Sequence, residues 1–318
     1  MNRLMVIGSI NLDLVLETNS LPTPGETVLG GTFSRINGGK GANQAVAAAR
    51  GGSPECPEVT FLAAVGDDDF GARVVEDYQV ECRLNASHIL TKTGFSTGVA
   101  AILVDQHAEN MICVAPGANA ELSVADVDAI DPQTLDNVEL LLASMEVPLK
   151  TIYAMIKRCK VGGARVILNP APVVPELIDH PILNEVDILT PNEHEAAQLA
   201  ARDVQDTESA IEAGREIIRK YGIQIVVITL GAEGVVVVES ASSYEVAAPQ
   251  VQAIDTTAAG DCFNGVLAAQ IAAGVDFREA VGLAVKAASL SVTRRGAQTS
   301  LPVYSEFASG ANTDRLMF

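Results

Sequence analysis

Apolar runs alternate with alanine-rich stretches along most of this chain. The runs are continuously apolar, which is typical of strands whose two sheet faces are both covered by helices. Strands are predicted over Leu4–Ile10, Val59–Val65, Val138–Ala143, Arg165–Leu168, Val186–Leu189, Gln224–Leu230 and Val235–Glu239. Helices are predicted over Gly41–Arg50, Gly71–Val80, Leu149–Cys159, Glu193–Ala201 and Thr207–Tyr221. This alternation predicts an α/β fold on a mostly parallel sheet with right-handed crossovers.

Two stretches, about 12–34 and 97–115, depart from that pattern. They hold short strands of alternating polarity, such as Thr97–Val104 and Asn110–Val114. Alternation fits an antiparallel sheet with one exposed face, so we predict a small β lid outside the main sheet. Further on, 260–292 has a helical pattern that charged residues near Asp276 divide into two helices.

The length of 318 residues fits two domains of ordinary size or one large α/β domain. No repeat, linker or low-complexity segment divides the chain. We therefore expect one catalytic domain over residues 1–318, with the lid built from the two departing stretches.

The net charge of −19 narrows the classes of partner. Nucleic-acid binding needs many Lys and Arg contacts to phosphate, and anionic membranes repel an acidic surface, so neither partner is expected. An anionic ligand can still bind where local groups outweigh the overall negative charge, such as the backbone N–H groups at a helix N-terminus.

The cysteines and the apolar runs indicate in which cellular compartment the protein is expected. Five cysteines without a C-x-x-C pair predict reduced thiols and no zinc site. No apolar run reaches the 18 residues of a membrane span, and the chain does not start like a signal peptide. A cytoplasmic protein is expected.

The segment 255–261, DTTAAGD, leads into a predicted long helix. An Ala-Ala-Gly turn leaves backbone N–H groups unobstructed, and with the helix N-terminus they can hold the charge of a phosphoryl group in transfer. Asp261, just inside that helix, can accept a proton from an attacking hydroxyl. A simpler interpretation is equally open: Asp255 or Thr257 caps the helix, and Asp261 complements its dipole.

The segment 38–43, GGKGAN, is a second candidate. Three glycines let a ligand approach the backbone closely, and Asn43 lies one helical turn beyond Gly39 on the same face. A glycine-rich turn that begins a tightly packed alanine helix explains the same residues.

Polar residues also lie where predicted strands end. Asn11 and Asp13 share one face at the end of the first strand, and Glu146 follows a later strand. The carboxyl ends of parallel strands are where α/β proteins bind ligands. The alternatives are an Asx turn for the first two and a solvated strand end for Glu146.

Asn192 and Glu195, three residues apart at a helix start, form the spacing of a capping box. The same pair could order water around a nucleotide-bound Mg²⁺. The sequence alone leaves both interpretations open.

Taken together, seven segments resemble the ribokinase family of carbohydrate kinases, in the family's order and over nearly the whole chain. They are GSINLD at 8–13, GGKGANQAVAAAR at 38–50, LNPAP at 168–172, TPNEHE at 190–195, TLGAEG at 229–234, DTTAAGDCFNG at 255–265 and TRRGAQ at 293–298. One departure is Cys262, which follows the predicted base where a Thr is common; its similar size predicts little effect.

The resemblance implies a three-layer α/β/α core with a β lid that serves as a homodimer interface. It implies ATP-dependent phosphorylation of D-ribose at O5, with Mg²⁺ accompanying ATP and K⁺ as an activating cation. Another sugar or nucleoside as acceptor is the nearer alternative, and a non-catalytic sugar sensor the more distant one.

The resemblance also assigns residues. The general base is Asp261, and the anion hole is Ala258, Ala259 and Gly260. The sugar site is Asn11, Asp13, Gly39, Lys40, Asn43 and Glu146, with Asp261. The nucleotide side is Asn192, Glu195, Thr229, Gly231 and Gly234, with Gly260. The monovalent-cation site is Asp255, Thr257, Ser291, Arg294, Gly296 and Ser300.

Overall fold

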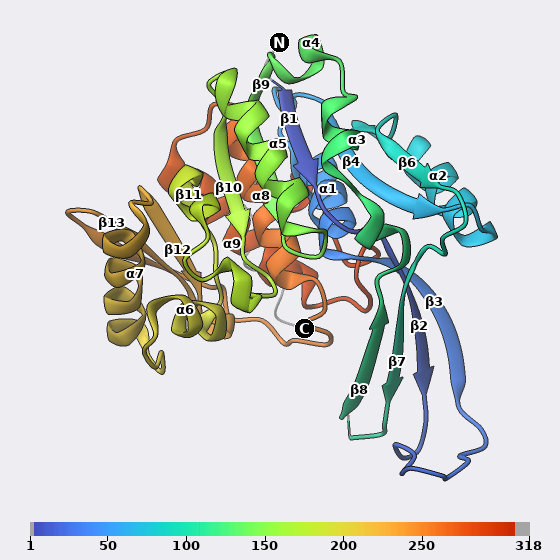
Figure 1. Cartoon of the computed structure of the whole chain (residues 1–318). Helices are drawn as coiled ribbons and strands as arrows, with labels where there is room; N and C mark the ends of the chain where they lie inside the picture. Colours follow the sequence, from blue (N-terminus) through green and yellow to red (C-terminus); the bar gives the residue numbers. More distant parts are fainter. Residues whose placement is uncertain (1–2, 108, 309–318) are drawn as a thin grey trace.

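The computed structural model describes residues 3–107 and 109–308, and a ten-stranded sheet runs through its centre (Figure 1). The order of its strands is β14-β13-β12-β11-β10-β9-β1-β4-β5, with β6 beside β4. The strands are β1 (Arg3–Ile7), β4 (Val59–Gly66), β5 (Leu84–Asn85), β6 (Ile89–Lys92), β9 (Val138–Ser144), β10 (Arg165–Asn169), β11 (Ile188–Leu189), β12 (Ile225–Thr229), β13 (Gly234–Glu239) and β14 (Ser243–Ala247). All pairs are parallel except those that β13 makes with β12 and β14.

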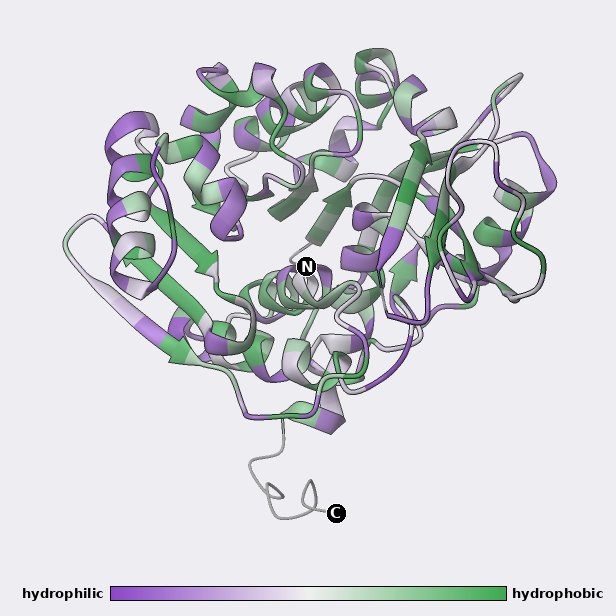
Figure 2. Cartoon of the chain, turned by 90° about the horizontal axis from the view of Figure 1, so that it is seen from below, coloured by the Kyte–Doolittle hydropathy of each residue, from purple (hydrophilic) through white to green (hydrophobic). Residues whose placement is uncertain are grey.

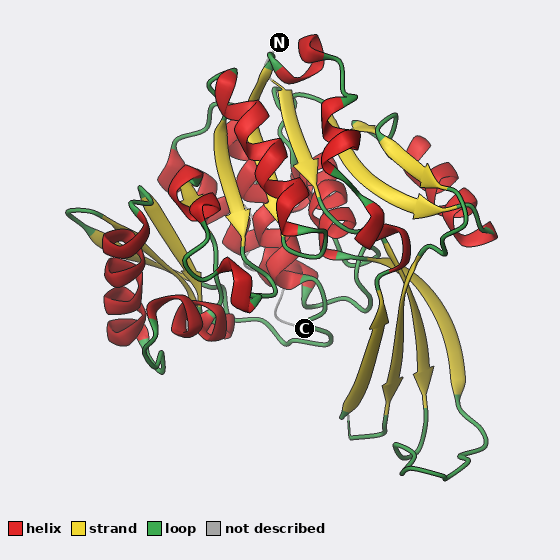
Figure 3. Ribbon diagram, viewed as in Figure 1, coloured by secondary structure: helices red, strands yellow, loops and turns green. Residues whose placement is uncertain are grey.

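Helices cover both faces of this sheet (Figure 3). One face packs against α1 (Lys40–Gly51), α2 (Asp69–Gln79), α8 (Ala259–Ala272), α9 (Phe277–Ser291) and α10 (Tyr304–Phe307). The other packs against α3 (Val124–Asp128), α4 (Pro132–Leu135), α5 (Leu149–Val161), α6 (Glu193–Ala200) and α7 (Thr207–Tyr221), and the short turns η1 (Gly117–Glu121), η2 (Pro175–Leu177) and η3 (Pro181–Glu185). Because both faces of its central part are buried, strands such as β1 and β4 are almost entirely apolar, and the predicted three-layer α/β/α fold is confirmed.

A separate four-stranded sheet projects from the core (Figure 1). It consists of β3 (Thr32–Gly38), β2 (Asn11–Glu17), β7 (Gly98–Val104) and β8 (Asn110–Ala115), in that order. The outer pairs are antiparallel as predicted, whereas the two central strands, β2 and β7, run parallel because they come from separate segments that leave the core in the same direction. We call this sheet the lid.

The first predicted strand needs a correction. The pattern placed Asn11 and Asp13 at the end of a strand over Leu4–Ile10, but β1 ends at Ile7 and a new strand of the lid begins at Asn11. The apolar run continues across the break because Ile10 is buried where the chain passes from one sheet to the other. Asn11 and Asp13 therefore belong to the lid and not to the core sheet.

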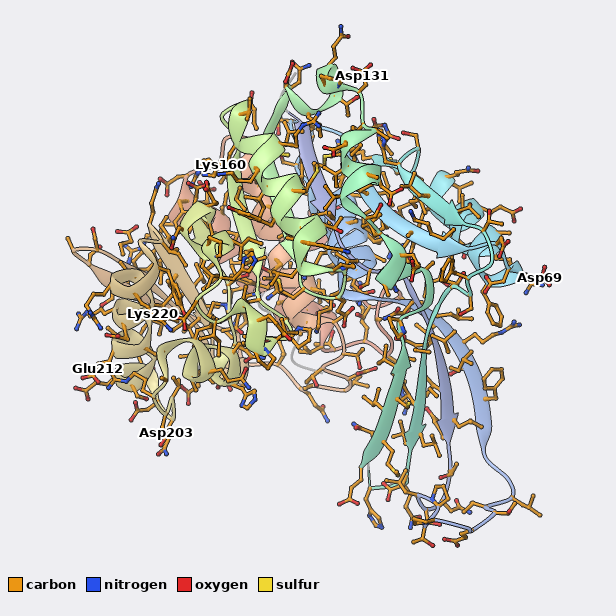
Figure 4. The ribbon with its side chains drawn as sticks, in the orientation of Figure 1. Asp69, Asp131, Lys160, Asp203, Glu212 and Lys220 are labelled. Atoms are coloured by element: carbon orange, nitrogen blue, oxygen red, sulfur yellow. The ribbon has the colours of Figure 1, made fainter. Side chains whose placement is uncertain are left out.

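Polar and charged side chains lie on the outside of this arrangement. Asp69, Asp131, Asp203 and Glu212 point outward at the edge of the molecule in Figure 4. The strands of the large sheet are mostly hydrophobic, and the outer helices carry hydrophilic residues (Figure 2). No helix within the described ranges is long and apolar enough to cross a membrane.

Candidate active site

The predicted base, Asp261, lies in the first turn of α8 and is only 7% exposed. The residue before the helix, Ala258, has a left-handed backbone (φ 60°), and none of the described side chains caps the helix. The first N–H groups of a helix have no intrahelical acceptor, and this end of α8 carries the positive end of the helix dipole. The N–H of Ala259 donates to the carbonyl of Thr256 at 3.3 Å. Asp261 is thus placed beside a turn that suits an anion, as the sequence predicts for Ala258, Ala259 and Gly260.

Two side chains from α1 donate hydrogen bonds to the carboxylate of Asp261. The Nδ2 of Asn43 lies 3.0 Å from Oδ2, and the Nε2 of Gln44 lies 3.0 Å from Oδ1. Burial raises the pKa of Asp261; the positive charge of Lys40 and these two hydrogen bonds oppose the rise. The carboxylate is therefore a stronger base than an exposed Asp.

Glu146 is fixed by the loop that begins α1. Its Oε2 accepts hydrogen bonds from the Ser9 hydroxyl, at 2.6 Å, and from the backbone N–H of Lys40, at 3.0 Å. Gly39, which precedes Lys40, has φ 89°, and a Cβ there would lie 2.7 Å from the backbone N of Asn11. Only glycine suits this turn, which brings the lid strand and α1 together.

Asp13 faces the same group of charges from β2. Burial, and then repulsion by Glu146 and Asp261, raises its pKa to about 6. Burial alone would lower the pKa of Lys40, but attraction by Asp261, Glu146 and Glu195 outweighs it and raises that pKa. Asp261, Glu146 and Glu195, from three separate segments of the chain, thus attract one lysine.

Asn11, the last of the predicted sugar-site residues, is held by a residue that the sequence analysis did not single out. Asn119, from η1, donates to the Oδ1 of Asn11 at 2.9 Å and exchanges two hydrogen bonds with the backbone of Ile10. Every residue predicted for the sugar site therefore lies in one place, where the lid meets α1 and the start of α8.

The predicted nucleotide residues divide into two groups. Thr229, Gly231, Gly234 and Gly260 line one cavity of about 250 Å³. Its other walls are mostly small and apolar residues, among them Ala253, Phe263, Val285, Ala288 and Val292. Sequence analysis missed these residues because small apolar positions on helices have no pattern that distinguishes a cavity wall from a core.

Asn192 and Glu195 do not line that cavity. They form the capping box that the spacing allowed: Asn192 N–H donates to Glu195 Oε2 at 2.9 Å, and Glu195 N–H to Asn192 Oδ1 at 2.8 Å. Burial raises the pKa of Glu195, and its charge acts on Lys40. A capping role is thus present, and the predicted nucleotide role stays a prediction.

The predicted cation residues lie on two segments that meet. The carboxylate of Asp255 accepts from the backbone N–H groups of Thr257, at 2.9 Å, and Gly296, at 2.8 Å. These bonds outweigh the effect of burial and lower the pKa of Asp255. Arg294 pairs with Glu306 instead of Asp255, and the hydroxyls of Ser291 and Ser300 donate to nearby carbonyls. An ionised carboxylate among turn carbonyls suits a large, hard cation.

Cys262 is fully buried, and burial raises the pKa of its thiol to about 12. A thiol held in this way is inert. The departure from the usual Thr therefore adds no reactive group to the site.

A buried carboxylate, a helix N-terminus without a side-chain cap and an adjoining apolar cavity are compatible with phosphoryl transfer to a small hydroxylated acceptor. Residues 1–303 match the pfkB family of carbohydrate kinases, and the chain belongs to that family. It is 40% identical over 303 residues to the ribokinase of Haemophilus influenzae (95% of this chain, 96% of that protein) and 35% identical over 302 residues to the deoxyribokinase of Salmonella typhimurium (95% and 96%). The structure of Arabidopsis thaliana ribokinase complexed with ribose and ATP superposes with a TM-score of 0.86 at 28% identity, covering 97% of this chain and 98% of that one.

Proposed function

We propose that this protein transfers the γ-phosphoryl group of ATP to O5 of D-ribose, giving D-ribose 5-phosphate and ADP. The observation that carries the proposal is the position of Asp261: it lies at the uncapped start of α8, between the group of polar residues at the lid and the apolar cavity. An acceptor hydroxyl on one side of Asp261 would face a phosphate on the other.

The chain's own residues have distinct tasks in this reaction. Asp261 accepts the proton of the sugar hydroxyl as its oxygen attacks the γ-phosphorus, and the bond to the ADP oxygen breaks. The backbone N–H groups at Ala258, Ala259 and Gly260 stabilise the charge on the transferring group. Asn11, Asp13 and Glu146 accept or donate hydrogen bonds to the other hydroxyls and fix the sugar.

The nucleotide lies in the cavity beside Gly260. Its small apolar walls suit a flat base, and the turn of Gly231 and Gly234 lets the backbone approach it. Mg²⁺ would arrive with ATP, and we expect Asn192 and Glu195 to order water around it.

The test is the rate of ADP release with ATP and a panel of sugars: D-ribose, 2-deoxy-D-ribose, D-fructose and adenosine. D-ribose should give the highest kcat/KM, and the product should carry phosphate at O5. A higher kcat/KM for another member of the panel would reassign the acceptor, and binding of ribose without turnover would make the protein a sensor.

We further propose that K⁺ activates the enzyme at Asp255, Thr257, Ser291, Arg294, Gly296 and Ser300. A cation there would stiffen the turn that leads to the anion hole, because Asp255 already joins that turn to Gly296. Initial rates in KCl should exceed those in NaCl and tetramethylammonium chloride at equal ionic strength, several-fold. Equal rates in all three salts would contradict the site.

The lid is proposed as the interface of a homodimer. Phe33, Met111, Ile112 and Val114 are each more than half exposed there. The register places Phe33 and Met111 on one face of the lid and Ile112 and Val114 on the other, and exposed apolar residues favour association. Ile112→Lys with Val114→Lys should convert a dimer into a monomer in sedimentation velocity, whereas Val161→Lys, at an exposed residue of α5, should not. A wild-type monomer would contradict the interface.

The five free cysteines support a reducing, cytoplasmic location.

A further inference from the structure

We propose that Gln44 is a positioning residue, whose side-chain amide holds the carboxylate of Asp261 in its ionised form and in a fixed orientation. This inference rests on the proposed role of Asp261 as base. Sequence analysis assigned Gln44 no task, although it lies within the glycine-rich segment.

The geometry around Gln44 leaves its amide little freedom. The side chain is fully buried, and its Nε2 lies 3.0 Å from Asp261 Oδ1 and 3.0 Å from Asn169 Oδ1. Both N–H groups of the amide are therefore used, one on the base and one on Asn169. Asn169 in turn donates to the backbone carbonyl of Thr190 at 2.9 Å, so the acceptor that orients Gln44 is itself fixed.

The same chain of hydrogen bonds returns to the anion hole. The hydroxyl of Thr190 donates to Asn264 Oδ1 at 2.5 Å, and Asn264 Nδ2 donates to the carbonyl of Gly260 at 2.8 Å. Gln44 thus belongs to a buried network with the base at one end and the backbone of the predicted anion hole at the other. Such a network holds both parts in one geometry.

Close packing of α1 against α8 makes these contacts possible. A Cβ on Gly265 would lie 2.4 Å from the backbone oxygen of Gln44 and 2.6 Å from the methyl of Ala47. Without a side chain at Gly265, the two helices approach closely enough for a Gln side chain to reach Asp261.

The polar atoms that lack partners favour a role in function over one in stability. Within the described part of the chain, the Oε1 of Gln44 and the Oδ1 of Asn43 are buried without a hydrogen-bond partner. A buried unpaired oxygen is destabilising. Both amides therefore present their donors to Asp261 and leave their acceptors unpaired, which is the orientation that favours a carboxylate.

The charges around Asp261 make such donors necessary. Glu146 raises the pKa of Asp261 by repulsion, and Asp13 and Glu195 are also coupled to it electrostatically; Lys40 is the cation that opposes them. A hydrogen bond to a carboxylate favours the ionised form, so the loss of Gln44 should raise the pKa of the base.

The experiment compares Gln44→Met with wild-type protein in single-turnover formation of ADP, at saturating D-ribose and ATP, from pH 5 to 9. Met has a similar length and no donor. The rate on the plateau should fall about tenfold, and the midpoint of the acid limb should rise by about one pH unit. The KM values for both substrates should change less than about threefold. At saturating sugar the rate reports the bound complex, in which any titration of Asp13 should contribute to both proteins, so the comparison between them isolates the effect of Gln44.

Gln270→Met is the matched control. Gln270 is also fully buried, donates one hydrogen bond to the carbonyl of Gly51 at 2.7 Å and has an unpaired Oε1 within the described structure. It lies on α8 but does not contact Asp261, so its substitution should lower stability and leave the midpoint of the acid limb unchanged. Gln44→Glu, which adds a charge beside the base, should raise the midpoint further than Gln44→Met.

An acid limb for Gln44→Met that coincides with wild type would overturn the inference. If that variant does not fold, Asn169→Ser decides instead: it removes the acceptor that orients Gln44 and should move the midpoint in the same direction by less, and no movement would overturn the inference. Asp261→Asn distinguishes a failure of the proposed base from a failure of the proposed role of Gln44. If it remains active, the proposed base is wrong; if it is inactive while Gln44→Met keeps the wild-type limb, only the role of Gln44 is wrong.

Discussion

The two sides of the N-terminus of α8 differ in the residues that form them: charged side chains on one side, and small apolar residues on the other. On the lid side, Asp13 is repelled by Glu146 and Asp261, and these two carboxylates, with Glu195, attract Lys40. On the other side, the cavity is walled mostly by glycines, alanines and valines, and none of its lining residues is charged. The first side therefore offers a ligand charged hydrogen-bonding groups, and the second offers it an apolar cavity of fitting shape.

This difference follows from what each ligand presents. A small sugar presents hydroxyls in several directions, and each needs its own partner, because a buried polar group left unpaired is penalised. A nucleotide presents a flat base and a chain of phosphates, which small residues and free N–H groups accommodate without dedicated charges. Substitutions should therefore affect the two ligands separately.

The largest effect is expected from Asp261→Asn, because Asp261 lies between the two sides. The variant keeps the shape and loses the base, so kcat should fall by roughly 10²–10⁴. Binding of each ligand should largely persist, because the other residues assigned to the sugar and all of those assigned to the nucleotide are unchanged. The measurement is kcat by ADP release together with titration of ribose and ATP; retention of more than a tenth of wild-type kcat would show that Asp261 is not the base.

Asp13→Asn tests the charged side. Loss of the charged hydrogen bond should weaken ribose binding about 10- to 100-fold and leave ATP affinity in the absence of sugar unchanged. Calorimetric titration of each ligand measures this. Equal weakening of ribose and ATP binding would contradict separate sites for the two ligands.

The same variant should be more stable than wild type, with a defined pH dependence. The pKa of Asp13 is about 6 in the folded protein and 3.8 as the ordinary value, so folding disfavours the ionised form. Wild-type stability therefore falls as pH rises through this window, and Asn avoids the loss. The gain in free energy of unfolding should be about 1–2 kcal/mol at pH 8 and smaller at pH 5, as measured by urea unfolding; a gain that is equal at both pH values would contradict the shift.

Ala288→Phe tests the apolar side, with the smallest effect. A larger side chain in the cavity wall should raise the KM for ATP about tenfold, as expected for a loss of around one to two kcal/mol of binding. The Kd of ribose, measured without nucleotide, serves as the internal control. Unchanged nucleotide binding would place the nucleotide elsewhere.

The core could be predicted because its physical signals are local. Strands covered on both faces are apolar throughout, and helix starts such as Asn192 have caps. The short edge strands β5 and β6 and the antiparallel β14 were missed, because two to five residues without a buried face leave no pattern. The break after Ile7 was missed for the converse reason: a buried residue outside any strand resembles a strand residue.

The predictability of the site differs between its two sides. Asn11, Asp13, Asn43 and Glu146 were candidates because polar residues at turns and expected strand ends are conspicuous, whereas Lys40 was assigned by the family resemblance. The structure brings these residues together. Gln44 and Asn119 were not, because their tasks depend on long-range contacts with Asp261 and Asn11. The cavity wall was predicted only at its glycines and Thr229, since the rest is indistinguishable from core.

The carboxylates around Lys40 have a last consequence, for events after the transfer. The entering sugar is neutral, whereas a phosphate monoester carries a charge of about −1.5 to −2 at neutral pH. Repulsion between like charges is strong at a buried site, where water screens poorly. Product that re-enters this pocket faces Asp13 and Glu146 with the wrong charge. The carboxylates proposed to bind the sugar should thus also hinder the return of its ester, and accumulating product should compete only weakly with fresh sugar.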